Sequence, residues 1–382
     1  MNFKYILPVF LFSGTVMFSQ GTSQIIVPNE NLIAENIPAI PKSLSEKIKK
    51  YSESRSANFT AIHPNGKELI MVTRFASTNQ LHQISQPMGN RKQLTFFDEP
   101  VNSADYEPVK GEYLIYSKDI GGNEFGQLFR LDLKTMESKL LTDGGRSQNG
   151  GIMWKKDGSG FYFSSTKRNG GDRDVYFMNP LKPEETRLVL EVKGGGWRIN
   201  DISSDGKKLI IGEYVSANES HLYLFDTETQ KLQSITDRNE KQIVQGNARF
   251  SKNADEIWYV TDRGNEFNRL ASLNLKTKKI SYFTTDIPWE VSNYTLSKDK
   301  SKIAFETNES GLNKMYLMDA NSKKYSEIKG LPVGLVNNFE FTNDGKSLFF
   351  SQSTYDSSAD IYRLDLASNK IERWTDSEQG EM

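Results

Sequence analysis

Four polar segments of this chain carry the same dipeptide, Asn-Glu. They are Asn123-Glu124, Asn218-Glu219, Asn265-Glu266 and Asn308-Glu309. A group of carboxylates on one face of a protein could receive a cation such as the terminal amine of a peptide. Asparagine also tolerates the left-handed conformation of a turn, and glutamate is soluble, so the simpler interpretation is structural. Glu124, Glu219, Glu266 and Glu309 are therefore candidate contacts for a peptide or a partner, with that structural alternative left open.

Two tryptophans stand in segments that read as loops rather than strands. Trp197 follows Gly194-Gly195-Gly196, and Trp289 lies in Ile287-Pro288-Trp289-Glu290. Loops carry function more often than strands do, and an exposed aromatic ring can mark a contact surface. We expect both tryptophans on the same face as the Asn-Glu pairs, as further candidate contacts.

Serine hydrolase chemistry requires a nucleophile on a strained turn, usually Gly-x-Ser-x-Gly, with a histidine and a carboxylate. The nearest segment, Gly158-Ser159-Gly160, lies in a turn that is polar throughout the chain. The three histidines are His63 in a first turn and His82 and His221 on the third strands of different units. The sequence therefore assigns no catalytic residue, and it leaves the activity of the chain open.

Metal and cofactor sites are not indicated either. The chain has no cysteine and no paired histidines at helical spacing. Asp172 and Asp174 flank Arg173, an arrangement that we interpret as a solvated turn. The glycines before Trp197 do not open a helix after a strand, so we interpret them as a connection between units rather than a nucleotide cradle. We expect no cofactor and no metal.

Composition narrows the class of partner. The formal net charge is −1, so the chain lacks the excess of positive charge that is typical of proteins that bind nucleic acid. At the amino terminus, Lys4 precedes an apolar stretch from Tyr5 to Phe18, with the small residues Ser19 and Gly21 after it. This resembles a secretory signal peptide and is short for a membrane span. We expect residues 1–20 to be a signal, the chain to be periplasmic or secreted, and no membrane span to remain after cleavage.

The elements that must position these residues repeat seven times. The repeat markers lie 45, 47, 48, 49, 45 and 45 residues apart, at Gly66, Gly111, Gly158, Gly206, Asp255, Lys300 and Gly345. After each turn comes a continuous apolar strand, for example Leu69–Val72, Phe161–Phe163 and Leu348–Phe350. A run without alternation indicates a strand covered on both faces. A period near 45 with four strands per unit is typical of a β-propeller, so we predict an all-β fold with seven four-stranded blades.

The third strand of most units ends in Asp or Asn, and the fourth tends to end in Thr. An Asp or Asn side chain can bond the backbone two residues on and so favours leaving the strand there. We place the propeller at 59–375, with blades at about 59–95, 103–142, 151–190, 197–236, 246–284, 291–328 and 336–375, and a stub at 376–382.

Residues 21–58 form an amino-terminal extension in which we predict one short helix. Leu44, Ile48 and Tyr51 recur at helical spacing, and Ser43 can cap the first turn. The extension is either a clamp on the propeller or a docking arm for another domain.

Many segments of the chain, in the same order, resemble the propeller portion of bacterial prolyl oligopeptidase family serine peptidases, the dipeptidyl aminopeptidase and acylaminoacyl peptidase-like enzymes. They include Arg55-Ser56-Ala57, Gln93-Leu94-Thr95-Phe96-Phe97, Gly194-Gly195-Gly196-Trp197, Gly212-Glu213-Tyr214-Val215-Ser216, Ile287-Pro288-Trp289 and Arg373-Trp374-Thr375-Asp376-Ser377-Glu378. As a set they form a specific match, although single turn motifs are shared with many TolB-like propellers.

The resemblance implies a substrate-gating role. In this family the propeller precedes an α/β-hydrolase domain that carries the catalytic serine, aspartate and histidine, and this sequence stops where that domain would begin. No catalytic residue can therefore be carried over to it. The chain is either the noncatalytic propeller of such a peptidase, with peptides and a hydrolase domain as partners, or a free-standing periplasmic module that binds a protein or peptide.

Overall fold

The computed structural model describes residues 24–380, which fall into two compact units. The first contains the described residues up to Ser54 together with Gly380, and the second runs from Arg55 to Gln379. The signal expected at 1–20 lies outside the described residues. Within 24–380, no helix combines the length and the apolar character needed to cross a membrane.

The first unit holds helix α1 (Lys42–Ser52), as the spacing of Leu44, Ile48 and Tyr51 predicts. Pro41 occupies the position before the first turn, and no side chain caps the helix, so the expected cap at Ser43 is wrong. Ser43 lies two residues after Pro41, inside the first turn. No residue of α1 is buried, and Lys49 pairs with Glu53 at 3.1 Å.

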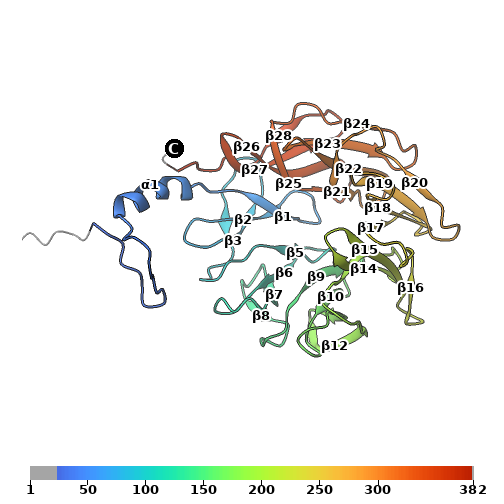
Figure 1. Ribbon diagram of the computed structural model, residues 1–382, viewed down its shortest axis with the longest axis horizontal. Coiled ribbons are helices and arrows are strands. Elements are labelled where there is room, and N and C mark those ends of the chain that lie inside the picture. The colour runs from blue at the N-terminus through green and yellow to red at the C-terminus, as the bar shows by residue number, and fades with distance from the viewer. Residues whose placement is uncertain (1–23, 381–382) are drawn as a thin grey trace, which may run out of the picture. The chain divides into compact units, whose positions relative to one another are not determined.

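The second unit is a seven-bladed β-propeller, as the sequence predicts, and each blade is an antiparallel sheet whose four strands follow chain order. Figure 1 shows the first strands of the blades around the centre and the fourth strands outside. The first four blades contain β1 (Asn58–Ile62), β2 (Leu69–Thr73), β3 (Gln80–Ile84), β4 (Lys92–Gln93); β5 (Ala104–Tyr106), β6 (Tyr113–Lys118), β7 (Gln127–Asp132), β8 (Ser138–Leu140); β9 (Asn149–Trp154), β10 (Phe161–Ser165), β11 (Asp174–Asn179), β12 (Lys182–Leu190); and β13 (Trp197–Ile202), β14 (Lys208–Ser216), β15 (Glu219–Asp226), β16 (Lys231–Ser234). The last three contain β17 (Gln245–Phe250), β18 (Glu256–Thr261), β19 (Arg269–Asn274), β20 (Ile280–Tyr282); β21 (Glu290–Leu296), β22 (Lys302–Glu309), β23 (Leu312–Asp319), β24 (Tyr325–Glu327); and β25 (Gly334–Phe341), β26 (Ser347–Thr354), β27 (Ser357–Asp365), β28 (Ile371–Arg373).

The second strand of each blade is covered on both faces. All five residues of β2 and of β10 are buried, and so are the first six of β26. The core is divided among seven clusters in the described ring, one at each boundary between neighbouring blades. Each blade therefore needs a neighbour on both sides, as the continuous apolar runs predict.

Repeated polar residues terminate the strands. Asp132 accepts the backbone N–H groups of Lys134 and Thr135 at 2.9 Å, and Asp226 does the same for Glu228 and Thr229. The threonines that follow the fourth strands have a second role. The hydroxyls of Thr95, Thr142, Thr236, Thr284 and Thr375 accept N–H groups from the third strands at 2.9–3.1 Å. They continue the sheet hydrogen bonding beyond the fourth strand.

The turns between first and second strands pack against one another on one face of the ring, which we call the turn face. A Cβ added to Gly66 would meet Thr342 of the last blade, one on Gly206 would meet Lys155, and one on Gly345 would meet Ser297. Each contact joins a turn to the turn of the preceding blade. Loops between blades and hairpins between second and third strands lie on the opposite face, the hairpin face.

The ring closes between blade 7 and blade 1 without a shared strand, because each of these blades is built from one continuous segment. The core cluster there includes Phe59 and Leu69 of blade 1 and Phe349 and Trp374 at blade 7. The backbone N–H of Phe59 donates to Ser351 Oγ at 2.9 Å, and that of Ala57 donates to the Ala359 carbonyl at 2.6 Å. Side-chain packing and a few hydrogen bonds therefore hold the seam.

We predict that Phe349→Ala lowers the free energy of unfolding by about 3–5 kcal/mol, because it removes a fully buried ring and leaves a cavity at the seam. Urea denaturation followed by tryptophan fluorescence measures the change. Tyr355→Ala, at a side chain that is 94% exposed, is the control and should change stability by less than about 0.5 kcal/mol. Equal effects of the two substitutions would show that burial of Phe349 at the seam does not make this contribution to the free energy of unfolding.

Candidate functional site

Backbone hydrogen bonds build the hairpin face. At three blade junctions, the entry to a blade bonds to the residue just before the third strand of the preceding blade: Val101 N–H donates to the Asn79 carbonyl, Asn149 N–H to Gly126 and Val291 N–H to Asn268, each at 2.9 Å. Interblade loops and hairpins are therefore held side by side. This arrangement places the four Asn-Glu pairs on the same face as the two tryptophans. Trp289 lies in an interblade loop as expected, whereas Trp197 is the first residue of strand β13 and not a loop residue.

Two of the four candidate glutamates are neutralised by their own surroundings. Glu219 accepts from His221 Nε2 at 3.1 Å and from Lys241 Nζ at 3.3 Å. Glu309 pairs with Lys314 Nζ at 2.6 Å and accepts from the hydroxyls of Thr307 and Tyr316 at 3.0 Å.

These partners lower both pKa values. The pKa of Glu219 falls mainly through the hydrogen bond from His221. Burial raises the pKa of Glu309, but the combined hydrogen bonds from Lys314, Thr307 and Tyr316 outweigh it and the net shift is downward. Both carboxylates are thus ionised and already engaged.

Glu124 and Glu266 are exposed, and neither side chain has a partner within residues 24–380. Glu124 itself adopts the left-handed conformation, with φ of 63°, whereas none of the four asparagines does. The asparagines serve as hydrogen-bonding turn residues: Asn123 Oδ1 accepts from Phe125 N–H at 3.0 Å, and Asn308 Oδ1 accepts from Gly311 N–H at 2.9 Å. The left-handed explanation is therefore wrong, although the pairs do shape turns.

The two tryptophans are half-buried. Trp197 Nε1 donates to the Lys193 carbonyl at 2.9 Å, and its ring lies 5.1 Å from that of Tyr223. Trp289 packs on Phe267 of the neighbouring blade, with ring centroids 6.4 Å apart. Trp197 thus supports blade 4, and Trp289 joins the hairpin that carries Glu266.

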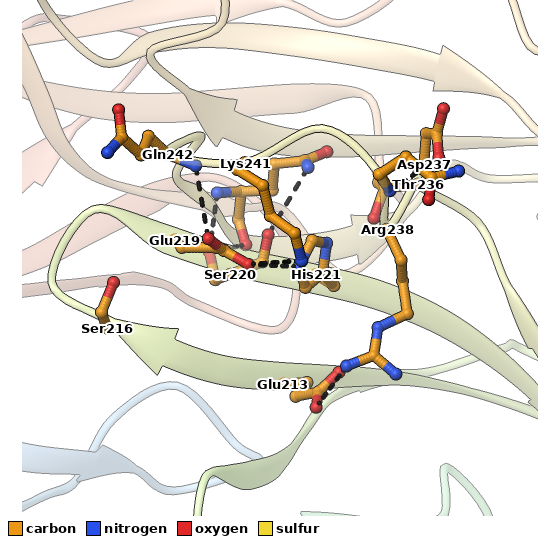
Figure 2. Close-up of polar contacts among 12 residues, drawn as sticks. Glu213, Ser216, Glu219, Ser220, His221, Thr236, Asp237, Arg238, Lys241 and Gln242 are labelled. Atoms are coloured by element: carbon orange, nitrogen blue, oxygen red, sulfur yellow. Dashed lines mark hydrogen bonds and ion pairs between the residues drawn. The ribbon is translucent and has the colours of Figure 1, made fainter.

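Figure 2 shows the polar cluster around Glu219, the blade 4 cluster, which consists of Glu213, Glu219, His221, Arg238, Lys241 and Gln242. Arg238 pairs with Glu213 at 3.1 Å, and Tyr223 Oη donates to the same carboxylate at 2.5 Å. Together with the Glu219 contacts, these bonds tie the loop between blades 4 and 5 to blade 4. The cluster orders one part of the hairpin face.

His221 is completely buried beside Ser220, but the serine is committed to the backbone. Ser220 Oγ donates to the Gln245 carbonyl at 2.9 Å and accepts from Gln245 N–H at 2.8 Å. The pair of His221 and Glu219 is therefore not coupled to a nucleophile at this hydroxyl. The charged side chains of the blade 4 cluster can therefore bind a ligand through ion pairs and hydrogen bonds.

The segment around Arg173 differs from the solvated turn expected from the sequence. Asp174 is completely buried, accepts from Arg168 Nε at 2.7 Å and from Val192 N–H at 2.9 Å, while Asp172 pairs with Arg168 at 2.9 Å. Because Asp174 opens β11, its side chain faces the next interblade loop and anchors it. The prediction of a solvated turn is wrong for Asp174.

A second charged site lies at the centre of the ring and was not anticipated from the sequence. Asp105 of β5 and Glu340 of β25 line a cavity of about 180 Å³ with Thr60, Pro64 and Asn343, which we call the axial cavity. Asp105 and Glu340 are themselves exposed to solvent, although many protein atoms crowd each carboxyl group. Desolvation by this surrounding protein raises the pKa of Asp105 to about 6, and desolvation together with the charge of Asp105 raises that of Glu340 to about 7.

Each acid stands between two buried residues of a first strand, in Ala104-Asp105-Tyr106 and Phe339-Glu340-Phe341. A carboxylate in that position of an innermost strand is the sequence signal that could have identified them. Among residues 24–380, no group of three or more His, Asp or Glu side chains is arranged to hold a metal ion.

Comparison with protein families identifies one matching family. Residues 101–377 match the family described as "Prolyl oligopeptidase, N-terminal beta-propeller domain". No curated protein sequence matches the chain.

Solved structures show the same architecture at low sequence identity. A structure from a study of two prolyl endopeptidases superposes with a TM-score of 0.73 at 14% identity, over 89% of this chain and 52% of that one. Apo prolyl oligopeptidase B from Galerina marginata gives 0.69 at 12% identity, over 89% and 54%. An oligogalacturonate lyase in complex with manganese gives 0.64 at 13% identity, over 81% and 89%. The chain thus spans about half the length of the prolyl peptidases that it resembles.

We predict that Glu340→Gln stabilises the chain at pH 8 but not at pH 4. Between the pKa of an unfolded glutamate, about 4.3, and about 7, the folded chain keeps a proton on Glu340 that the unfolded chain releases. Stability of the parent protein therefore falls as the pH rises through this window, and a neutral amide avoids the loss.

Urea midpoints of both proteins at the two pH values measure this difference. Glu137→Gln removes an exposed carboxylate that lies outside the cavity and serves as the control. A Glu340→Gln effect that is independent of pH would contradict the prediction.

Proposed function

The chain belongs to the family of prolyl oligopeptidase N-terminal β-propeller domains, and we propose that it is the substrate-gating propeller of a peptidase whose catalytic serine lies in an α/β-hydrolase domain. In this role the ring covers the active site, admits short peptides and excludes folded proteins. Export of the chain through the segment at 1–20 is part of the same proposal.

The observation that carries the proposal is the distribution of exposed apolar side chains over the ring. Nine large apolar residues that are exposed lie in the hairpins, the interblade segments or the adjoining strand ends of the hairpin face: Phe75, Phe96, Ile120, Tyr214, Val215, Leu312, Val333, Leu335 and Tyr355. Four lie in turns of the opposite face: Met88, Val109, Met136 and Leu181. Exposed apolar surface on one face favours a partner that covers it.

The two ends of the ring also meet on the hairpin face. Arg55 N–H donates to the Glu378 carbonyl at 2.9 Å, and the Arg55 guanidinium pairs with the Glu378 carboxylate at 2.8 Å. A polypeptide that continues from either end of the ring therefore starts at the apolar face. This geometry favours the docking of a further domain there.

A second candidate function is a free-standing module that binds a protein or peptide. It is favoured by the oligogalacturonate lyase comparison, in which the match covers 89% of that chain, so a propeller of this kind can account for nearly a whole protein. Fold alone does not decide between the two functions.

A surface test follows from the apolar distribution. We predict that the isolated chain binds a hydrophobic dye such as 1-anilinonaphthalene-8-sulfonate, and that the triple variant Tyr214→Ser, Val215→Ser, Tyr355→Ser loses most of the signal. The matched control, Met88→Ser, Val109→Ser, Leu181→Ser, changes the opposite face. Equal dye binding by the two triple variants, or a parent chain that binds no dye, would favour the free-standing module.

The decisive experiment uses the native protein, isolated from its source with an antibody to the ring. We predict that this material reacts with a fluorophosphonate probe and cleaves short peptides, whereas the recombinant chain alone does neither, because the activated serine belongs to the hydrolase domain. A native protein that migrates near the 43.4 kDa of this chain, without a labelled companion, would overturn the proposal.

A further inference from the structure

A cavity of about 410 Å³ lies at the seam between blades 7 and 1, and we call it the seam pocket. Blade 1 lines it with turn residues at 65–67 and 85–87, and blade 7 lines it with Thr342, Asp344, Ser347, Arg363 and Trp374. Cavities of this size bind small molecules in many proteins. The polar groups of the lining therefore decide what kind of molecule the seam pocket can hold.

Arg363 of β27 has no acidic partner in this pocket. Its Nε donates to Ser347 Oγ at 3.0 Å, and within residues 24–380 no carboxylate forms an ion pair with its guanidinium group. Asp365 and Glu372 line a neighbouring cavity together with Arg363. Asp365 is held there by Ser368, since it accepts from the N–H and the hydroxyl of that serine at 2.9 and 2.7 Å. Nη1 and Nη2 of Arg363 are therefore available to a ligand.

Two other blades show what is missing beside Arg363. In blades 1 and 5 the residue in the place of Arg363 donates to a glutamate at the start of the second strand: Gln83 to Glu68 at 2.6 Å, and Ser272 to Glu256 at 2.5 Å. The glutamate of blade 5 also pairs with Lys323 of blade 6 at 3.6 Å. In blade 7 the strand register puts Ser347 in the place of these glutamates. Blade 7 thus has the cation of such a pair without the carboxylate.

Two further hydrogen-bond donors line the seam pocket. The ammonium group of Lys67, in the first turn of blade 1, has no partner in the part of the chain that the structure describes. Trp374 is only 3% exposed, and its indole N–H has no acceptor among the described residues. A buried donor without an acceptor lowers stability, and an oxygen atom of a ligand would remove that cost.

Asp344 is the acidic residue of the pocket lining, and it is held by its own turn. Its Oδ1 accepts from Thr342 Oγ1 at 2.6 Å and from Lys346 N–H at 3.0 Å. The hydrogen bond from Thr342 is the main cause that lowers the pKa of this carboxyl, so Asp344 is ionised. It forms no ion pair with Arg363 or Lys67 within the described chain. The lining therefore has two cations against one carboxylate, and both cations are unpaired.

We propose that the seam pocket binds the anionic oxygen group of a small organic molecule, a phosphate or a carboxylate. The free Nη groups of Arg363 donate to two oxygens of this group, as a guanidinium does to either anion. Lys67 and the indole N–H of Trp374 donate to the oxygens from the two sides of the seam. The pocket lies between turns of the ring and away from the hairpin face, so this inference does not depend on the proposed peptidase role.

The test is a nuclear magnetic resonance titration of the full chain with sodium phosphate and with sodium succinate, each compared with sodium chloride at the same ionic strength. We expect the indole N–H signal of Trp374, identified by its loss in Trp374→Phe, to shift and saturate. The signal of Trp197, whose N–H already donates to the Lys193 carbonyl, should stay in place. A shift with one salt alone identifies the bound group, and a shift with both shows that the site takes either. No saturable shift, or an equal shift with chloride, overturns the proposal.

Variants tie the shift to the guanidinium group. Arg363→Gln gives blade 7 the residue that blade 1 has at this place, and it should weaken anion binding by about tenfold, or about 1.4 kcal/mol. Arg146→Gln makes the same change at an exposed arginine in a loop of the hairpin face and should leave binding unchanged. Unchanged binding in a folded Arg363→Gln variant overturns the proposal.

A second pair of variants supplies the missing carboxylate. Ser347→Glu places an acid where blades 1 and 5 have one, so it should pair with Arg363 and abolish anion binding without lowering the urea midpoint. Ser347→Gln adds a side chain of the same size without the charge and should retain most of the binding. Equal loss of binding in both variants would assign the effect to size and overturn the proposal. Should Arg363→Gln fail to fold, this pair of variants decides the question.

Discussion

Burial of the second strand on both faces is the constraint on which the rest of the ring depends. A strand such as β26, with six consecutive buried residues, cannot be satisfied by one neighbouring sheet. Each blade therefore shares one core cluster with the blade before it and another with the blade after it, and the requirement ends only when the circle closes. The seam between blades 7 and 1 meets the same requirement through Phe59, Phe349 and their neighbours, without exchange of a strand.

Much of this architecture could be predicted because its determinants are local and repeated. The turn spacing predicts the number of blades, and the apolar runs predict which strand is central. The terminal Asp of the third strand has the turn role expected of it, as Asp132 shows. The threonines were recognised as a pattern, but their role depends on a partner in the third strand 14 residues earlier, as between Thr95 and Leu81. A pattern along the sequence reveals the position but not that partner.

The candidate site could be located but not resolved from the sequence. Hairpins and interblade loops do share one face, yet Glu219 and Glu309 are engaged by Lys241 and Lys314, which lie outside their dipeptides. Asp174 meets Arg168 and a loop from the end of the blade. The effect of the Asp105 charge on Glu340 links the second blade with the last one. Such charge pairings depend on three-dimensional proximity, whereas turns and buried strands depend on nearest neighbours in sequence.

The hydrogen bond between Arg55 and Glu378 has an architectural consequence. Because the first and last residues of the ring lie next to each other, the two points at which the ring joins a longer polypeptide would also be adjacent in space. A host domain could therefore contain the whole propeller as an insertion in one surface loop, and the two ends of that loop would stay close together. Gain or loss of the ring by genetic recombination would then require little rearrangement of that host.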